Sequence, residues 1–237
     1  MTILRLLLVA ALGLTLAHGS ASARTASDPL EPLNRAVFHL NLATYDYVLA
    51  PAARYYRAAT TATERESVAN FVANLRAPTI AANQLLQGDG QRAKVTLARF
   101  AINSTVGLLG LFDPATEWGY PRQLPEDFGQ TLARYGVPSG PYIVLPLVGP
   151  CNARDAVGRA ADYLALSSYL DTEAFYAFVG TTALSEAEPA LEQDAAAREA
   201  ALDLYAASRS AYEQRREDAI RNGVPGTDPD YDGIFAP

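Results

Sequence analysis

The sequence of 237 residues predicts an all-α protein that forms a single domain. Apolar residues recur at helical spacing in several segments, capping patterns precede those segments, and no internal repeat or polar linker divides the chain. Apolar residues make up 49% and charged residues 19% of the sequence. This composition argues against intrinsic disorder and favours a membrane-associated surface.

Residues 1–23 have the layout of a secretory signal peptide. A short basic start is followed by the apolar run 6–17, and Ala21-Ser-Ala23 offers a cleavage site. The alternative is a retained membrane anchor, but a helix of this run would rise only about 18 Å against a hydrocarbon core of ~30 Å. We therefore expect export and a domain that covers residues 24–223.

The first half of that domain predicts a series of helices. The first runs to Ala50 and stops before Pro51, and the second begins at the capping box Thr63-x-x-Glu66 and ends at Pro78. A short helix follows over 80–87. Gly88 closes it and Asp89 caps the next helix, whose apolar face carries Val95, Ala98, Ile102 and Val106.

The middle of the chain is different in character. Residues 113–127 are rich in turn-forming residues, and 142–148 form an apolar run interrupted by Pro146 and closed by Gly149-Pro150. Proline argues against a regular helix or a central strand there. The sequence predicts an apolar loop or loose hairpin that is buried or that meets lipid or a partner.

Helices resume in the last third. We expect helices over 152–166 and 172–179, and then one long helix from the capping box Ser185-x-x-Glu188 to Asn222. Residues 224–237 predict a flexible acidic tail.

Charge and residue counts exclude several kinds of site. The net charge is −7 without a basic run, so nucleic acid is not an expected partner. One cysteine and two histidines leave no framework for a disulfide network or a metal centre, and we expect no metal and no cofactor. Asp228-x-Asp230-x-Asp232-Gly233 resembles the start of a calcium loop, but the glutamate of position 12 is missing, so we interpret it as acidic tail.

Three candidates for covalent chemistry are weak. Ser139 does not lie in a nucleophile elbow, and Cys151 could pair only with His39 once the signal peptide is removed. Glu126 and Asp127 could act as an acid and base pair, although adjacent acids are usually solvated. We predict no catalytic residue.

The first helix carries a mixed stripe. Asn34, Phe38, Asn41 and Tyr45 fall on one face, where amides and aromatic rings could contact both ends of an amphipathic ligand. The structural alternative is that the asparagines pair with buried backbone groups.

These residues begin a series of motifs that resembles the MlaA (VacJ) family of outer-membrane proteins. The series runs over roughly 28–223 and comprises Asp28-Pro-Leu-Glu-Pro-Leu-Asn-Arg35, Phe38-x-x-Asn41, Asn70-Phe71, Asn74-Leu75, Pro78, Asn83, Leu86-Gln-Gly-Asp89, Arg99-Phe100, Asn103-Ser-Thr-Val-Gly107, Gly110-Leu-Phe-Asp113, Phe128-Gly-Gln-Thr-Leu132, Tyr135-Gly136, Gly140-Pro-Tyr142, Leu145-Pro146, Arg154-Asp155 and Tyr212-x-x-Arg215-Arg216.

The resemblance implies a single ring-like helical domain that lies in the inner leaflet of the outer membrane. Its amphipathic channel would remove mislocalised phospholipids from the outer leaflet and so maintain lipid asymmetry. The implied partners are phospholipids, outer-membrane porin trimers and a soluble periplasmic lipid-carrier protein of the same pathway. No covalent chemistry is implied.

The resemblance also assigns residues. The first-helix motif associated with channel shape and gating falls on Asn34, Phe38 and Asn41. The flexible loop beside the channel falls on Gly136, Gly140 and Pro141.

One feature departs from many members of the family, which carry a lipid on a cysteine directly after the signal peptide. Here Cys151 is the first cysteine, so we expect attachment to the outer membrane through the apolar surface of the ring and through partners. Two other functions stay open at this point, a soluble periplasmic lipid-binding protein without channel activity and an envelope hydrolase.

Overall fold

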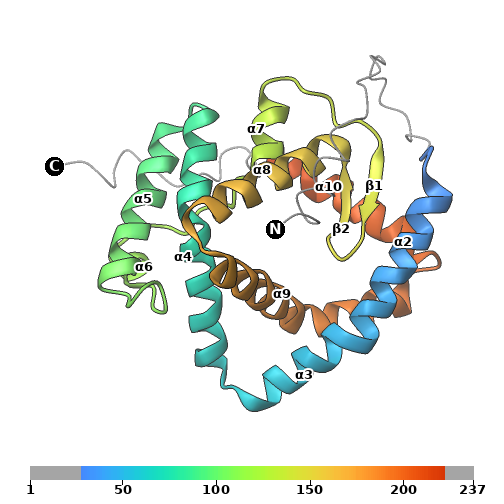
Figure 1. The fold of residues 1–237 in the computed structure, drawn as a ribbon, viewed down its shortest axis with the longest axis horizontal. Helices are drawn as coiled ribbons and strands as arrows, with labels where there is room; N and C mark the ends of the chain where they lie inside the picture. Colours follow the sequence, from blue (N-terminus) through green and yellow to red (C-terminus); the bar gives the residue numbers. More distant parts are fainter. Residues whose placement is uncertain (1–27, 222–237) are drawn as a thin grey trace.

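The computed structural model describes residues 28–221, which are mainly helical and arranged as a ring (Figure 1). The elements in chain order are α2 (Glu31–Thr44), the π-helix η2 (Tyr45–Leu49), α3 (Ala50–Ala59), α4 (Ala62–Leu86), α5 (Gly90–Thr105), α6 (Pro114–Glu117), α7 (Phe128–Arg134), β1 (Tyr142–Leu145), β2 (Gly149–Asn152), α8 (Ala153–Tyr169), α9 (Thr172–Ala200) and α10 (Leu204–Ile220). The predicted all-α class is confirmed. The expected signal peptide, tail and calcium-like motif lie outside the described residues.

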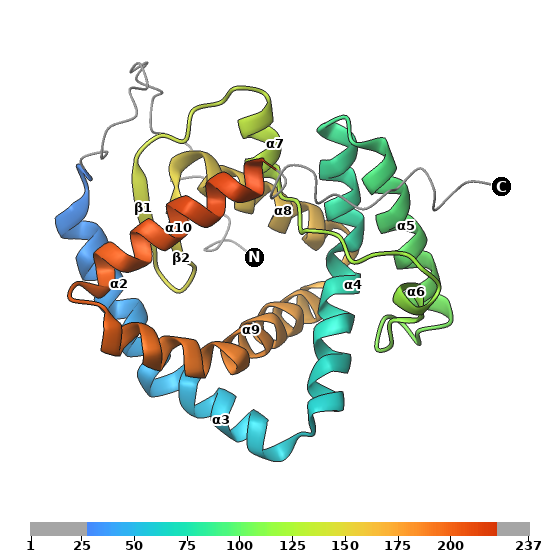
Figure 2. The same ribbon diagram turned by 180° about the vertical axis from the view of Figure 1, so that it is seen from behind.

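The ring has a clear order in both views (Figures 1 and 2). One side is the continuous arc of α2, η2 and α3, the opposite side is α4, and α8 with α10 completes the circuit. α5 and α6 lie outside α4, and α9 runs along the inner side of α3. Among the described helices, none combines the length and apolar character needed to cross a bilayer.

The predicted apolar hairpin is confirmed and is the only sheet in the described residues. β1 and β2 pair antiparallel, with Tyr142 opposite Asn152 and Leu145 opposite Gly149. The hairpin lies on the inner side of α2 (Figure 1). Its buried residues form a core cluster with Phe38 and two tyrosines of α10.

The expected helix end before Pro51 is wrong. The helical path continues through η2, where the amide of Ala50 donates to the carbonyl of Tyr45, five residues earlier. Pro51 lies directly after η2 in the first turn of α3, so the helical path lacks one backbone donor at the point where its hydrogen-bond pattern changes.

The expected helix end at Pro78 is also wrong, because α4 continues through Pro78 and includes the segment 80–87. An internal proline costs ~3 kcal/mol, so the packing of α4 against its neighbours outweighs the break. The capping box that starts α4 is Thr61 with Glu64, two residues before the one expected at Thr63 with Glu66. Both pairs fit the capping-box pattern. In the structure the extended backbone of an N-cap residue is found at Thr61.

The long helix expected from Ser185 is wrong at both ends. α9 begins at Thr172, where Asp171 caps it, so Ser185 lies in mid-helix and caps nothing. The helical path stops at Ala200, and Asp203 caps a separate α10. The predicted cap at Asp89 is confirmed, and Asn152, where the next helix was expected to begin, is the N-cap of α8.

Candidate functional site

The face of α2 that turns toward the hairpin carries Asn34, Phe38 and Asn41. Asn34 is 1% exposed, and its Nδ2 donates to the carbonyl of Tyr142 at 3.0 Å while its Oδ1 accepts from the amide of Val144 at 2.9 Å. The side-chain amide thus bonds one strand as the backbone of a neighbouring strand would.

Asn41 repeats this arrangement two turns later. Its Nδ2 donates to the carbonyl of Leu145 at 2.9 Å, and its Oδ1 accepts from the amide of Leu147 at 2.8 Å. Seven residues of helix rise about 10.5 Å and three residues of strand extend ~10 Å, so the two spacings match. Asn34 therefore covers the open edge of β1, an edge that usually needs a partner strand, and Asn41 holds the end of β1 and the turn that follows it.

Phe38 lies between the two asparagines in sequence and is 7% exposed. Its ring meets that of Tyr205 edge to face, with centroids 5.6 Å apart, and Tyr205 in turn meets Tyr142 at 6.2 Å. Tyr212 lies 5.9 Å from Tyr142 on the other side. An aromatic cluster thus joins α2, the hairpin and α10.

Charged side chains also connect α2 to the start of α10 beside this aromatic cluster. The hydroxyl of Tyr205 donates to Asp28, whose carboxylate also accepts from Nδ2 of Asn34 at 3.0 Å. Burial alone would raise the pKa of Asp28, but these hydrogen bonds lower it below its ordinary value. Arg35 of α2 pairs with Asp203 at 2.6 Å and lies 4.4 Å above the ring of Tyr205.

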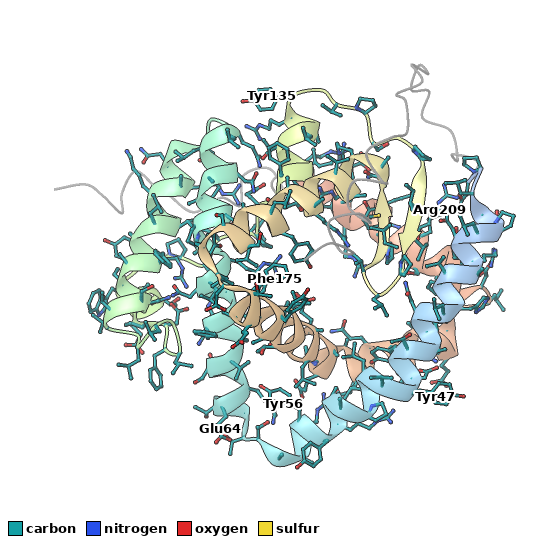
Figure 3. The ribbon with its side chains drawn as sticks, viewed as in Figure 1. Tyr47, Tyr56, Glu64, Tyr135, Phe175 and Arg209 are labelled. Carbon is teal, nitrogen blue, oxygen red and sulfur yellow. The ribbon has the colours of Figure 1, made fainter. Side chains whose placement is uncertain are left out.

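Tyr142 has a buried hydroxyl without a hydrogen-bond partner in the described residues. Burial raises the pKa of Tyr142 to about 12. The guanidinium of Arg209 lies 5.3 Å from the centre of its ring, and Figure 3 shows Arg209 between α10 and the hairpin. The phenol is therefore neutral at physiological pH.

Gly136 ends α7 as the left-handed cap of a Schellman motif. Its φ is 80°, its amide donates to the carbonyl of Ala133, and the amide of Val137 donates to that of Leu132. A Cβ at Gly136 would meet nothing within 4 Å, so its backbone conformation is what calls for glycine.

Gly140 and Pro141 lie against the start of α8. Gly140 has a φ of 67°, and a Cβ there would lie 2.9 Å from the Cβ of Ala153. The carbonyls of Pro141 and Ser139 accept from the amides of Ala153 and Arg154, both at 3.1 Å. The segment before the hairpin is thus anchored at α8, while the tip at Leu147 is 76% exposed.

The structure brings Asn34, Phe38 and Asn41 together against the hairpin, whereas Gly136 lies at the end of α7 and Gly140 and Pro141 lie against α8, on the segment that leads into the hairpin. The asparagines pair with backbone groups, which was the structural alternative. A role for these residues in gating stays a prediction.

Sequence reasoning missed the roles of Tyr142, Tyr205 and Asp28 in this corner. Tyr205 and Tyr212 are spaced seven residues apart on one helix face, which could have suggested an aromatic seam. The bond from Tyr205 to Asp28 joins residues 177 apart in the chain, and no local pattern predicts it.

The residues considered for covalent chemistry have structural partners. Cys151 is fully buried, and burial raises the pKa of its thiol to about 11, whereas the side chain of His39 is exposed. Glu126 is buried 2.9 Å from Nη1 of Arg92, and burial raises its pKa. Asp127 caps α7 and pairs with Arg216 at 2.6 Å; although burial opposes it, this pairing lowers the pKa of Asp127.

The family model described as MlaA lipoprotein matches residues 26–219. The chain belongs to the MlaA family.

Curated relatives agree with this membership. The chain is 37% identical over 223 residues to "Intermembrane phospholipid transport system lipoprotein MlaA" of Shigella flexneri, covering 90% of this chain and 87% of that protein. It is 35% identical over 221 residues to the protein of the same name from Escherichia coli (strain K12), with the same coverage.

A solved structure agrees as well. It is described as "Structural basis for maintenance of bacterial outer membrane lipid asymmetry" and matches with a TM-score of 0.75 at 34% identity, covering 83% of this chain and 100% of the other. The ring is thus an MlaA-family fold, and the relatives are named as components of a transport system. The relatives are named lipoproteins. In this sequence the one cysteine is Cys151, which is buried in β2.

Proposed function

We propose that this MlaA-family protein is the outer-membrane component of an intermembrane phospholipid transport system. Its ring lies in the inner leaflet of the outer membrane, and phospholipids mislocalised to the outer leaflet pass inward through its centre. The observation that carries the proposal is the ring itself, an MlaA-family fold in which a hairpin lies on the inner side of the wall and is held there by side chains.

Exposed apolar side chains on the outside of the ring support a membrane location. Along the arc of α2 to α3 the stripe contains Leu33, Leu40, Tyr47, Val48 and Tyr55, each more than half exposed. Tyr47 points away from the ring (Figure 3). Large apolar side chains that recur on one exposed arc are typical of a surface that meets lipid or a partner, and lipid tails would cover them.

The hairpin is the part of the ring best suited to regulate passage. Its base is anchored to α8, whereas its tip is held by Asn41, through Leu145 and Leu147, and by Arg159 of α8, which donates to the carbonyl of Val148 at 3.4 Å. We propose that Asn34 and Phe38 fix the base of the hairpin, that Asn41 holds or releases the tip, and that Gly136, Gly140 and Pro141 set the path into it.

The test of function is the amount of surface-exposed phospholipid in cells that lack the gene. A phospholipase that reaches only the outer leaflet measures it. We expect a rise on deletion and a return to the starting level when the protein is supplied from a plasmid. An unchanged level in cells without a second family member would contradict the proposal.

Asn41→Ala tests the role of the hairpin tip in the same cells. The variant should restore the surface phospholipid level only partly, because the tip loses both of its hydrogen bonds to α2. Thr44→Ala is the matched control: its exposed hydroxyl bonds the carbonyl of Leu40 in its own helix at 3.0 Å, and it should restore the level fully. Equal behaviour of the two variants at equal protein levels would exclude a role for Asn41.

We propose porin trimers and a soluble periplasmic lipid carrier as partners. Cross-linking in intact cells followed by purification should yield a complex that contains a heat-modifiable porin trimer. A soluble lipid-binding protein would instead leave the membrane in a carbonate wash, so complete release without retained porin would favour that alternative.

The proposed transport requires no covalent chemistry from this chain. Cys151→Ser and Glu126→Gln should leave complementation unchanged wherever the variant accumulates normally. Loss of activity in a correctly folded variant would favour a hydrolase instead.

A further inference from the structure

A cavity of about 330 Å³ lies in the outer part of the ring wall, between α4 and α5. The segment after α6 passes over these two helices on its way to α7 (Figure 2), and Arg122, Gln123 and Pro125 from this segment help to line the cavity. None of the six residues assigned to the hairpin site lines it.

The charged side chains that line the cavity are mainly cationic. Arg76, Arg99 and Arg122 line it together with a single carboxylate, that of Asp113. Asp113 is fully engaged: it accepts from Arg99 at 2.8 and 2.9 Å, from Asn103 at 2.9 Å and from Arg122 at 2.9 Å.

Arg99 is committed to the fold, because it also bonds the carbonyl of Tyr120 at 2.5 Å and the hydroxyl of Thr116 at 3.0 Å. The other two arginines are held less tightly. Within the described chain, Arg76 makes one ion pair, at 3.5 Å with the exposed Glu186, and its side chain is 47% exposed.

Arg122 has a side chain that is 58% exposed, and beyond Asp113 it contacts the oxygen of Asn70 at 3.0 Å and the exposed Glu66 at 4.0 Å. Both arginines can therefore turn toward an added anion without leaving a buried carboxylate unpaired.

Apolar side chains line the cavity beside the arginines, on the same two helices and on the segment before α7. They are Ala73, Ala77, Ile80, Phe100 and Pro125. A site that places guanidinium groups beside small apolar side chains suits a ligand with an anionic end and a hydrocarbon end, since arginine binds phosphate and carboxylate through paired hydrogen bonds.

We propose that this cavity binds the anionic headgroup of an amphiphile, with a phosphate or carboxylate at Arg76 and Arg122 and the adjoining hydrocarbon against Ile80 and Phe100. The volume is at the lower end of ligand pockets and accommodates a headgroup with a few carbons, so the acyl chains extend outside. The site is separate from the hairpin and goes beyond the proposed transport function.

Binding of short-chain lipids below their micellar concentration tests the proposal. We would titrate the purified full chain in a non-ionic detergent with dihexanoyl phosphatidylglycerol and with dihexanoyl phosphatidylcholine, using calorimetry. We expect at least tenfold tighter binding of the anionic lipid. Equal affinity for the two lipids would overturn the proposal.

Two variants assign the binding to the cavity. Arg76→Gln combined with Arg122→Gln should abolish the tenfold preference, whereas Arg54→Gln combined with Arg134→Gln, the same change of charge at two exposed arginines elsewhere, should keep it. Ala73→Leu fills the opening from an exposed position without a change of charge and should weaken binding of the anionic lipid at least fivefold. Unchanged binding of the anionic lipid by the Arg76→Gln, Arg122→Gln double variant and by Ala73→Leu would overturn the proposal.

Hexanoate and inorganic phosphate distinguish an amphiphile site from a simple anion site. Dihexanoyl phosphatidylglycerol should bind more tightly than inorganic phosphate, and equal affinities would overturn the role given to the apolar lining residues. Hexanoate competing as well as the lipid would identify a fatty acid as the ligand. Asn41→Ala should leave all these affinities unchanged, so failure of this site and failure of the proposed transport are separate results.

Discussion

The two asparagines of α2 differ in burial although they make the same pair of bonds. Asn34 is 1% exposed, and Asn34→Ala would leave the amide of Val144 and the carbonyl of Tyr142 without partners. An unsatisfied buried polar group costs about 1–3 kcal/mol. We expect the free energy of unfolding, measured with urea in detergent, to fall by about 3 kcal/mol.

Asn41→Ala provides the comparison, because Asn41 bonds the exposed tip and water can replace it there. Its expected loss is about 1 kcal/mol. Equal losses for the two variants would mean that burial does not distinguish the two ends of the hairpin.

The buried thiol of Cys151 should react slowly with reagents in solution. Its thiol is fully buried and its pKa is raised to about 11 by burial, so at pH 8 very little thiolate is present or accessible. A maleimide should label the folded protein at least a hundredfold more slowly than the protein in urea. Ser139→Cys in a Cys151→Ala background places a thiol at an exposed position and should label rapidly without urea.

At the scale of elements, the crossing of α7 and α8 depends on two glycines. A Cβ at Gly158 would lie 2.3 Å from the amide nitrogen of Gly129, a distance that the backbone cannot accept without a shift. Gly158→Ala should lower the free energy of unfolding by about 3 kcal/mol or more. Gly180 in α9 has nothing within 4 Å, and Gly180→Ala should stabilise by about 0.5–1 kcal/mol because alanine favours the helix.

The start of α6 predicts a pH dependence. Burial opposes ionisation of Asp113, but its bonds from Thr116, Asn103 and Arg99 lower its pKa to about 2. Because the folded pKa is depressed, the stabilisation is complete above the ordinary pKa near 4 and is lost as the pH falls through about 2. Asp113→Asn should reduce the slope of stability against pH between 4 and 2. An unchanged slope would mean that groups other than Asp113 cause the loss of stability in acid.

The sequence predicted the presence of the helices better than it predicted the residues at which they end. The caps at Asp89 and Asn152 act within one turn and could be predicted, whereas Pro51 and Pro78 were misleading because tertiary packing carries a helix through a proline. The stop after Ala200 has no local signal apart from Asp203, whose partner is Arg35 on the first helix. A boundary set by a distant partner cannot be predicted from a local pattern.

At the scale of the whole molecule, the ring and the position of the hairpin were expected from family resemblance alone. The contacts that close the ring join α2 to α10 and to the hairpin, more than a hundred residues away. Helical periodicity identifies the faces of single helices, and it contains no information about which helices meet. The cavity between α4 and α5 was likewise not predicted, because its arginines are spread over 76–122.

A membrane location of the whole ring predicts a fluorescence signal. Trp118 is the one tryptophan of the chain and is 56% exposed, near an apolar segment that includes Leu108, Leu109 and Phe112. In vesicles of brominated phospholipid its emission should be quenched relative to unbrominated vesicles. Emission that remains unquenched, with the protein retained on the vesicles, would place this lobe in water.

The side-chain amides that cover β1 also constrain the order of folding. Asn34 and Val144 are 110 residues apart, while α4 and α5 are neighbours in the chain and can pair early. Contacts of high sequence separation form late because the intervening loop must first be closed. The first helix of the described chain to be synthesised is therefore among the last to reach its final hydrogen bonds, and until then its hairpin-binding face stays open to other partners.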